Sequence, residues 1–139
     1  MTPVLVGIAL ACIVAAFARI VGFDRDRAFY PVVLVVVASY YDLYALMPDG
    51  ANLVAEMVGF AAFAAAAVIG FRTSLWVVAA GLAGHGVFDF FHGALIDNPG
   101  VPNWWPGFCG AYDVAAAACL AVLLVWRRPS LDQVIVESK

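Results

Sequence analysis

The sequence predicts an all-α, polytopic membrane protein built as a bundle of five transmembrane helices, and three observations support this. Hydrophobic residues make up 65% of the 139 residues and charged residues only 12%, whereas soluble domains contain about 25% charged residues. The polar surface that a soluble domain needs is missing, so the apolar excess must face lipid. The apolar residues also fall into five stretches of about 20 residues, the length at which a helix crosses a bilayer.

Local signals support each span in turn. The predicted spans cover residues 3–22, 28–47, 51–70, 74–95 and 108–126. The charged segment 23–27 ends the first span, and Pro31 falls in the first turn of the second, where its missing N–H is harmless. A Pro-Asp-Gly turn at 48–50 precedes the third span, and the polar segment 71–73 precedes the fourth. The longest connection, 96–107, contains three prolines and leads into the fifth.

The basic residues predict the orientation of the bundle. They lie at positions 19, 25, 27, 72, 127, 128 and 139. With five spans all of them fall on one side, which the positive-inside rule assigns to the cytoplasm. We therefore expect a transmembrane domain over residues 1–128 with its N-terminus outside, and a short cytoplasmic tail over 129–139, in the inner membrane of a bacterium. A signal peptide cleaved near Ala18 is the alternative for the first span, but cleavage would leave Arg25 and Arg27 outside.

Four carboxylates share one depth in the predicted bundle. Asp42, Glu56, Asp89 and Asp113 each lie near the outer end of a different span, about 8 Å below the outer boundary at about 1.5 Å per residue. A charged side chain within the membrane costs at least about 2.5 kcal/mol, and it usually faces the bundle interior. No Lys or Arg lies at this depth. The four carboxylates must therefore share protons, bind a cation or line water.

The fourth span adds the histidines that a metal site needs. His85, Asp89 and His92 are spaced i, i+4 and i+7, so they share one helix face. Two histidines and a carboxylate are a ligand set of catalytic zinc sites, which keep one position open. We expect the site to bind a divalent metal, with zinc as the first candidate. His85, His92 and at least one of three carboxylates would be the ligands, and a further carboxylate would act as the base. The three carboxylates are Asp89, Asp113 and Glu56, and the candidate bases are Asp89 and Glu56. A network of interhelical hydrogen bonds is the structural alternative.

Four further residues belong to the same predicted pocket, which opens to the outside. They are Asp42, Tyr41, Tyr112 and Cys109. Tyrosines near a membrane boundary also occur as an aromatic belt, which is the simpler explanation for Tyr41 and Tyr112. Cys109 lies one turn before Asp113, and a small buried hydrophobic residue is the alternative role for it.

These residues resemble a family of small, functionally uncharacterised bacterial integral membrane proteins. The resemblance rests on the H-x-x-x-D-x-x-H pattern from His85 to His92, the pair Asn98-Pro99, and the downstream Cys109 and Asp113. It covers roughly the last third of the helical region. The resemblance implies a membrane location and several helices, and it implies no reaction.

Three functions fit the predicted site. The first is a metal-dependent hydrolase or lipid-modifying enzyme that acts on a lipid-like, amphipathic substrate from the bilayer. The second is a transporter of protons or divalent cations, because intramembrane Asp, Glu and His also mark ion pathways. The third is a non-catalytic ligand-binding or structural subunit, in a homo-oligomer or a larger membrane complex. The net charge of −3 and the lack of a basic patch argue against nucleic acid. The sole lysine, Lys139, lies in the tail, so a Schiff base within the bundle is excluded.

Overall fold

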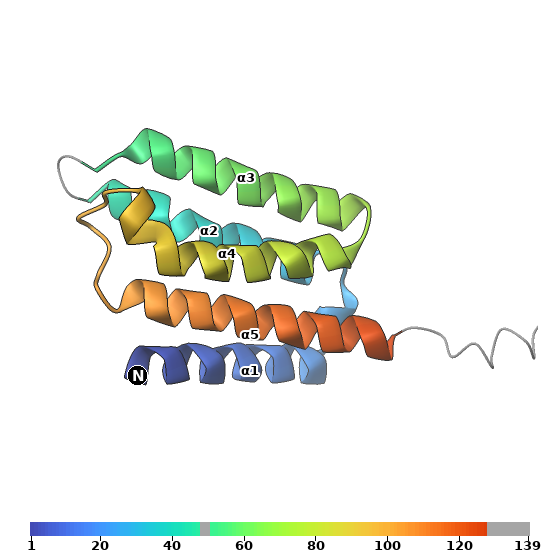
Figure 1. Cartoon of the computed structure of the whole chain (residues 1–139). Coiled ribbons are helices and arrows are strands. Elements are labelled where there is room, and N and C mark those ends of the chain that lie inside the picture. The colour runs from blue at the N-terminus through green and yellow to red at the C-terminus, as the bar shows by residue number, and fades with distance from the viewer. Residues whose placement is uncertain (48–50, 128–139) are drawn as a thin grey trace, which may run out of the picture.

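The chain folds into a bundle of α-helices that lie nearly side by side (Figure 1). The computed structural model describes residues 1–47 and 51–127. Its elements are α1 (Thr2–Val21), the 3-10 turn η1 (Phe23–Arg25), α2 (Phe29–Ala45), α3 (Leu53–Arg72), α4 (Leu75–Leu95) and α5 (Trp105–Trp126). Within the described residues there is no strand, so the all-α prediction is confirmed. The predicted turn at 48–50 and the predicted tail at 129–139 lie outside the described residues.

The helix boundaries follow the local chemistry. Gly22 ends α1 in the left-handed conformation, with φ of 93°, which glycine adopts without strain. The side chains of Asn52 and Ser74 cap α3 and α4 by accepting hydrogen bonds from the backbone N–H groups of Ala55 and Trp76. The largest difference from the predicted spans is that α5 begins at Trp105 rather than at residue 108. Its proline lies in the first turn, where the missing N–H is tolerated.

Four helices are long and apolar enough to cross a membrane. These are α1, α3, α4 and α5, with 20 to 22 residues each, whereas α2 is a shorter apolar helix of 17 residues. Many large apolar side chains on the outside of the bundle are exposed, for example Ile20 at 84% and Val54 at 73%. This surface suits lipid and not water, so the chain has the character of a multi-pass membrane protein.

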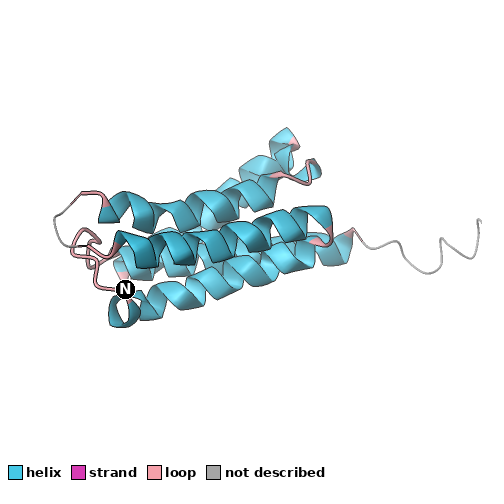
Figure 2. Cartoon of the chain, turned by 90° about the horizontal axis from the view of Figure 1, so that it is seen from above, coloured by secondary structure: helices cyan, strands magenta, loops and turns pink. Residues whose placement is uncertain are grey.

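The helices pack in a defined order. Helix α4 contacts α2, α3 and α5, and α1 lies along α5 at one edge of the bundle (Figures 1 and 2). Helices α4 and α5 pack backbone to backbone at Gly86 and Gly110. A methyl group added at Gly86 would lie 2.8 Å from the carbonyl oxygen of Gly110, and one added at Gly110 would lie 2.9 Å from that of Gly86. Glycine at both positions lets the two backbones meet, which brings the polar residues beside them together.

The end of the bundle opposite the N-terminus collects the described arginines. Asp24 in η1 is only 4% exposed, and its Oδ2 atom lies 3.2 Å from Arg19 Nη1 and 3.3 Å from Arg127 Nη2. Arg27 donates to the carbonyl oxygens of Gly70 and Thr73, where α3 turns into α4. These contacts join the helix ends on the side that the sequence assigns to the cytoplasm. We call Asp24 and its two arginines the arginine clamp.

Candidate metal centre

Four buried side chains from two helices form a group that could hold a metal ion. They are His85 and Asp89 of α4, and Cys109 and Asp113 of α5, and one ligand atom of each lies within 4.8 Å of those of the others. All four residues are at most 2% exposed. We call these four residues the metal cluster.

The geometry of the metal cluster follows from two matched helix faces. His85 and Asp89 lie one turn apart on α4, as do Cys109 and Asp113 on α5, so each pair projects from one face. The glycine contact between the helices turns the two faces toward each other. His85 Nδ1 lies 2.6 Å from Asp113 Oδ2 and 3.6 Å from Asp89 Oδ2, and Cys109 Sγ lies 3.8 Å from Asp113 Oδ2.

Three carboxylate oxygens of the metal cluster are buried without a hydrogen-bond donor among the described residues. Asp89 is 0% exposed, and neither of its carboxylate oxygens has a hydrogen-bond partner among the described residues. One oxygen of Asp113, Oδ1, is in the same situation. A buried polar group without a partner is costly, and a buried charge is normally paired or bound to a metal. These oxygens are therefore the strongest structural sign that the cluster binds a cation.

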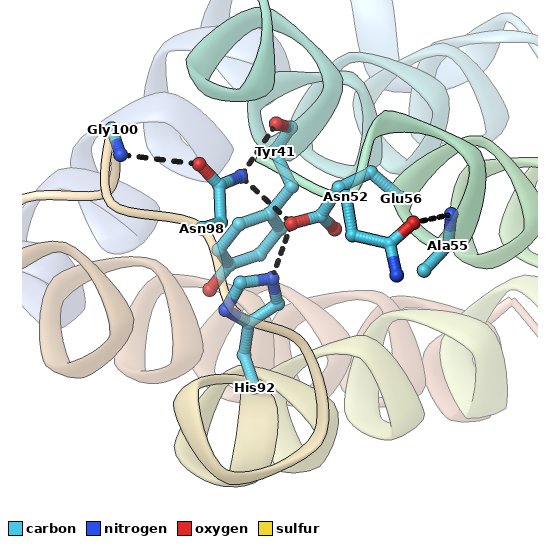
Figure 3. Close-up of polar contacts among 7 residues, drawn as sticks. All are labelled: Tyr41, Asn52, Ala55, Glu56, His92, Asn98 and Gly100. Atoms are coloured by element: carbon cyan, nitrogen blue, oxygen red, sulfur yellow. Dashed lines mark hydrogen bonds and ion pairs between the residues drawn. The ribbon is translucent and has the colours of Figure 1, made fainter. Parts of the chain in front are cut away.

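Figure 3 shows a second polar group, which joins α3, α4 and the loop before α5. His92 Nε2 lies 2.8 Å from Glu56 Oε1, and the same oxygen accepts a 2.7 Å hydrogen bond from Asn98 Nδ2. Asn98 also donates to the backbone oxygen of Tyr41 and accepts from the backbone N–H of Gly100. The bond to Tyr41 extends the group to α2. We call Glu56, His92 and Asn98 the His92 group.

The ring of Tyr41 separates the two groups. It stacks on the His92 ring with a centroid distance of 3.8 Å and an interplanar angle of 15°. Tyr41 is 2% exposed, and its hydroxyl lies close to the Asp89 carboxylate. That hydroxyl has no hydrogen-bond partner within the described residues. A single side chain therefore touches both polar groups.

The structure divides the ligand set that the sequence predicts. His85, Asp89 and Asp113 come together, but His92 and Glu56 form the neighbouring group instead. The reason is the helix rise, because an i, i+7 pair shares a face but is separated by about 10.5 Å along the axis. The two histidines therefore do not converge on one ion, and this corrects the predicted pairing.

Of the four remaining predicted pocket residues, Cys109 belongs to the metal cluster and Tyr41 lies between the two groups, while Asp42 and Tyr112 lie outside both. Asp42 is half-buried near Glu56, and its Oδ1 atom has no hydrogen-bond partner among the described residues. Tyr112 lies on α5 in the wall of an apolar groove. Neither residue contributes an atom to the metal cluster.

The sequence alone does not identify two residues of the polar groups clearly. Cys109 is a member of the metal cluster, and a local signal for it exists: His85-Gly86-x-x-Asp89 is repeated as Cys109-Gly110-x-x-Asp113. The repeat places a ligand, a contact glycine and an aspartate at the same spacing on both helices. Asn98 is the second, and its bond to Glu56 depends on a loop that folds back over the bundle, which no helical periodicity reveals.

The expected opening to the outside is also different in the structure. The gap beside Tyr41, Glu56, Phe63 and His85 has no room for a water molecule. Cys109, in contrast, lines a groove of about 710 Å³ between α1, α2 and α5. The metal cluster is thus closed on the side of the His92 group and borders an apolar space on the side of Cys109.

Comparison with protein-family models, with curated proteins and with solved structures finds no match to this chain.

Proposed function

We propose that the chain is a membrane metalloprotein whose metal cluster binds zinc, and that it acts as a metal-dependent hydrolase or related lipid-modifying enzyme. The observation that supports this most is the complete burial of Asp89, whose oxygens accept no hydrogen bond from the described residues and whose ionic contact is the His85 ring at 3.6 Å. An imidazole nitrogen, two carboxylates and a thiolate are all donors that zinc accepts. Calcium prefers oxygen donors alone, and a copper(I) site would contain more sulfur.

The distances within the metal cluster suit such an ion after small adjustments. Tetrahedral zinc ligands at about 2.0 to 2.3 Å from the ion lie about 3.3 to 3.8 Å from one another. The contacts from Asp89 to His85 and from Cys109 to Asp113 fall within that range, at 3.6 and 3.8 Å. The 2.6 Å contact of His85 with Asp113 would have to lengthen.

Each residue has a distinct role in this proposal. His85, Asp89 and Asp113 would hold the ion, which leaves the fourth position open on the side of Cys109, where the cluster borders the groove and substrate would approach. A bound zinc ion supplies Lewis acidity, which polarises a carbonyl or activates water for hydrolysis. Asp89 serves as a ligand, and Glu56, bound to His92 and Asn98 through Oε1, lies across the Tyr41 ring with no room for water between it and the cluster, so neither predicted base is placed to act on water at the ion.

We also propose that all five helices cross the inner membrane of a bacterium, with the N-terminus outside. Helix α2 has 17 residues, which gives about 25 Å at 1.5 Å per residue and falls at the short end of the range for spanning helices. Local thinning of the bilayer accommodates a short span at modest cost. The arginine clamp at the opposite end from the N-terminus supports this orientation.

Transport of protons or divalent cations uses the same carboxylates but finds less support. Among the described residues, no Asp, Glu or His lies between the level of His85 and Asp24 at the other end. A pathway across the membrane would need polar groups in that interval. The inner half of the bundle is packed with apolar residues instead, for example Leu34, Val78 and Leu120, each 0% exposed.

Elemental analysis of detergent-purified protein tests the metal. We expect one zinc ion per chain in the wild type, and loss of most of it in His85→Ala, Asp89→Asn and Asp113→Asn. His92→Ala is the matched control, because His92 lies on the same helix outside the metal cluster, and it should retain the ion. Wild-type protein without stoichiometric metal would overturn the proposal, and metal loss in His92→Ala as large as in His85→Ala would restore the ligand set predicted from the sequence.

A further inference from the structure

An apolar groove lies between α1, α2 and α5. Its volume is about 710 Å³, which is within the range of about 300 to 1,000 Å³ for small-molecule sites. The groove exists because α1 and α2 do not contact each other, although both contact α5. Helix α5 therefore forms its floor, and α1 and α2 form its walls.

The groove leads to the metal cluster. Cys109 on the floor belongs to both, since it lines the groove and its Sγ atom lies 3.8 Å from Asp113 Oδ2. No other residue of the metal cluster lines the groove. An occupant of the groove would thus meet the metal cluster at one defined point near its outer end.

The shape and lining of the groove suit one hydrocarbon chain. On α2 the lining extends from Ala28 to Tyr40, which is about 18 Å at 1.5 Å per residue and slightly more than the roughly 15 Å hydrocarbon depth of one leaflet. Asp26, at the inner end, is the only charged residue that lines it.

The outer end of the groove supplies polar atoms for the start of such a chain. Trp105 lines this end and is 8% exposed, and its indole N–H has no acceptor within the described residues. The hydroxyl-bearing side chains of Tyr40 and Tyr112 line the same groove. A buried indole N–H usually has a partner, and an ester carbonyl oxygen would accept its hydrogen bond.

We infer that the groove binds one acyl chain of a membrane phospholipid, with the ester end beside Trp105 and Cys109. If the proposed function holds, the bound phospholipid is the substrate, and the substrate class of the metal cluster is an ester lipid of the bilayer. That link rests on the proposed function. The binding itself depends only on the groove.

Photolabelling in lipid bilayers tests the occupant. The protein is reconstituted in nanodiscs of phosphatidylethanolamine and phosphatidylglycerol that contain phosphatidylethanolamine with a diazirine in its acyl chain. We expect mass spectrometry to find at least five-fold more label on groove residues than on other lipid-facing residues of equal exposure. Val36→Trp, which fills the groove from an exposed position on α2, should reduce that label at least five-fold. Val58→Trp is the control, because Val58 lies outside the groove at a lipid-facing position on α3 that is more exposed than Val36, at 67% against 45%.

The outcomes separate this inference from the metal proposal. Even labelling of all lipid-facing residues, or groove labelling that Val36→Trp leaves unchanged, would overturn the acyl-chain site. Absence of label from the groove together with a dimer in native mass spectrometry would assign the groove to a second copy, and would also overturn it. Zinc content is measured on the same samples, and we expect it to be equal in wild type, Val36→Trp and Val58→Trp. A labelled groove without zinc would reject the metal and leave the lipid site.

Discussion

Two buried aspartates at opposite ends of the bundle differ in what surrounds them. Asp24 is 4% exposed and Asp89 is 0% exposed, so burial does not distinguish them. The Oδ2 atom of Asp24 is paired with Arg19 and Arg127, whereas no Lys or Arg reaches Asp89. Asp24 therefore has a sufficient structural role in joining η1 to α1 and α5. One oxygen of Asp24, Oδ1, also lacks a hydrogen-bond partner among the described residues, but Asp89 has only the His85 ring at 3.6 Å as an ionic contact, so a proton or a bound cation would offset its burial.

The comparison also shows two ways to assemble a polar site. Arginine side chains are long, so the arginine clamp tolerates helix ends that are several ångströms apart. The side chains of the metal cluster are short, so α4 and α5 must approach closely, which the glycines at 86 and 110 allow. The arginine clamp should therefore be insensitive to backbone spacing, and the metal cluster should depend on it.

The largest expected effect is the response to a chelator. If the metal cluster holds zinc, a strong chelator should lower the free energy of unfolding by about 4 kcal/mol. The reference is protein in a free zinc concentration of about 1,000 times the Kd. Thermal melting in detergent, followed by tryptophan fluorescence, measures this. Asp89→Asn should show no response, while Asp24→Asn, equally buried, should respond as the wild type does. A wild-type melting temperature that is the same with zinc and with chelator would contradict the comparison.

The next effect comes from the helix spacing. Gly110→Ala places a methyl group 2.9 Å from the carbonyl oxygen of Gly86, so α4 and α5 must move apart. Strain of this kind costs about 1 to 3 kcal/mol, and metal affinity should fall by about ten-fold to a hundred-fold. Competition with a coloured zinc chelator measures the affinity. Gly93→Ala is the matched control on α4, because nothing lies within 4 Å of the added methyl group, and its affinity should equal that of the wild type.

The helices were predictable from the sequence because each is a continuous apolar stretch, and the described boundaries agree with the predicted ones to within about three residues. The shared depth of Asp89, Asp113 and Glu56 was also visible. What depth cannot supply is the direction in which each helix faces. Periodicity placed His85 and His92 on one face of α4, but the neighbouring helices decided that His85 meets Asp113 and that His92 meets Glu56.

Cys109 and Asn98 illustrate two further limits. Cysteine is common as a buried hydrophobic residue, so Cys109 gained meaning only when the packing of α5 against α4 placed it beside Asp113. The repeated ligand-Gly-x-x-Asp pattern on the two helices is the signal that could have identified it. Asn98 lies in a loop, and loops have no periodicity from which a contact with Glu56 on another helix could be inferred.

The smallest effect, and the one that sharpens the comparison most, is expected for Arg127→Ala. It removes the 3.3 Å ion pair with Asp24 and the 2.9 Å hydrogen bond to the Asp24 backbone oxygen, while Arg19 remains in place. Loss of a fully buried pair costs about 3 to 5 kcal/mol and of an exposed pair about 1 kcal/mol or less. The Arg127 side chain is 37% exposed, so we expect about 1 to 2 kcal/mol in thermal or denaturant unfolding, with Arg25→Ala as a control at the same end. Zinc content should not change, because the arginine clamp lies at the opposite end of α5 from Cys109 and Asp113. Loss of zinc in Arg127→Ala would mean that the two ends are coupled through α5, and the separation of a structural aspartate from a functional one would then fail.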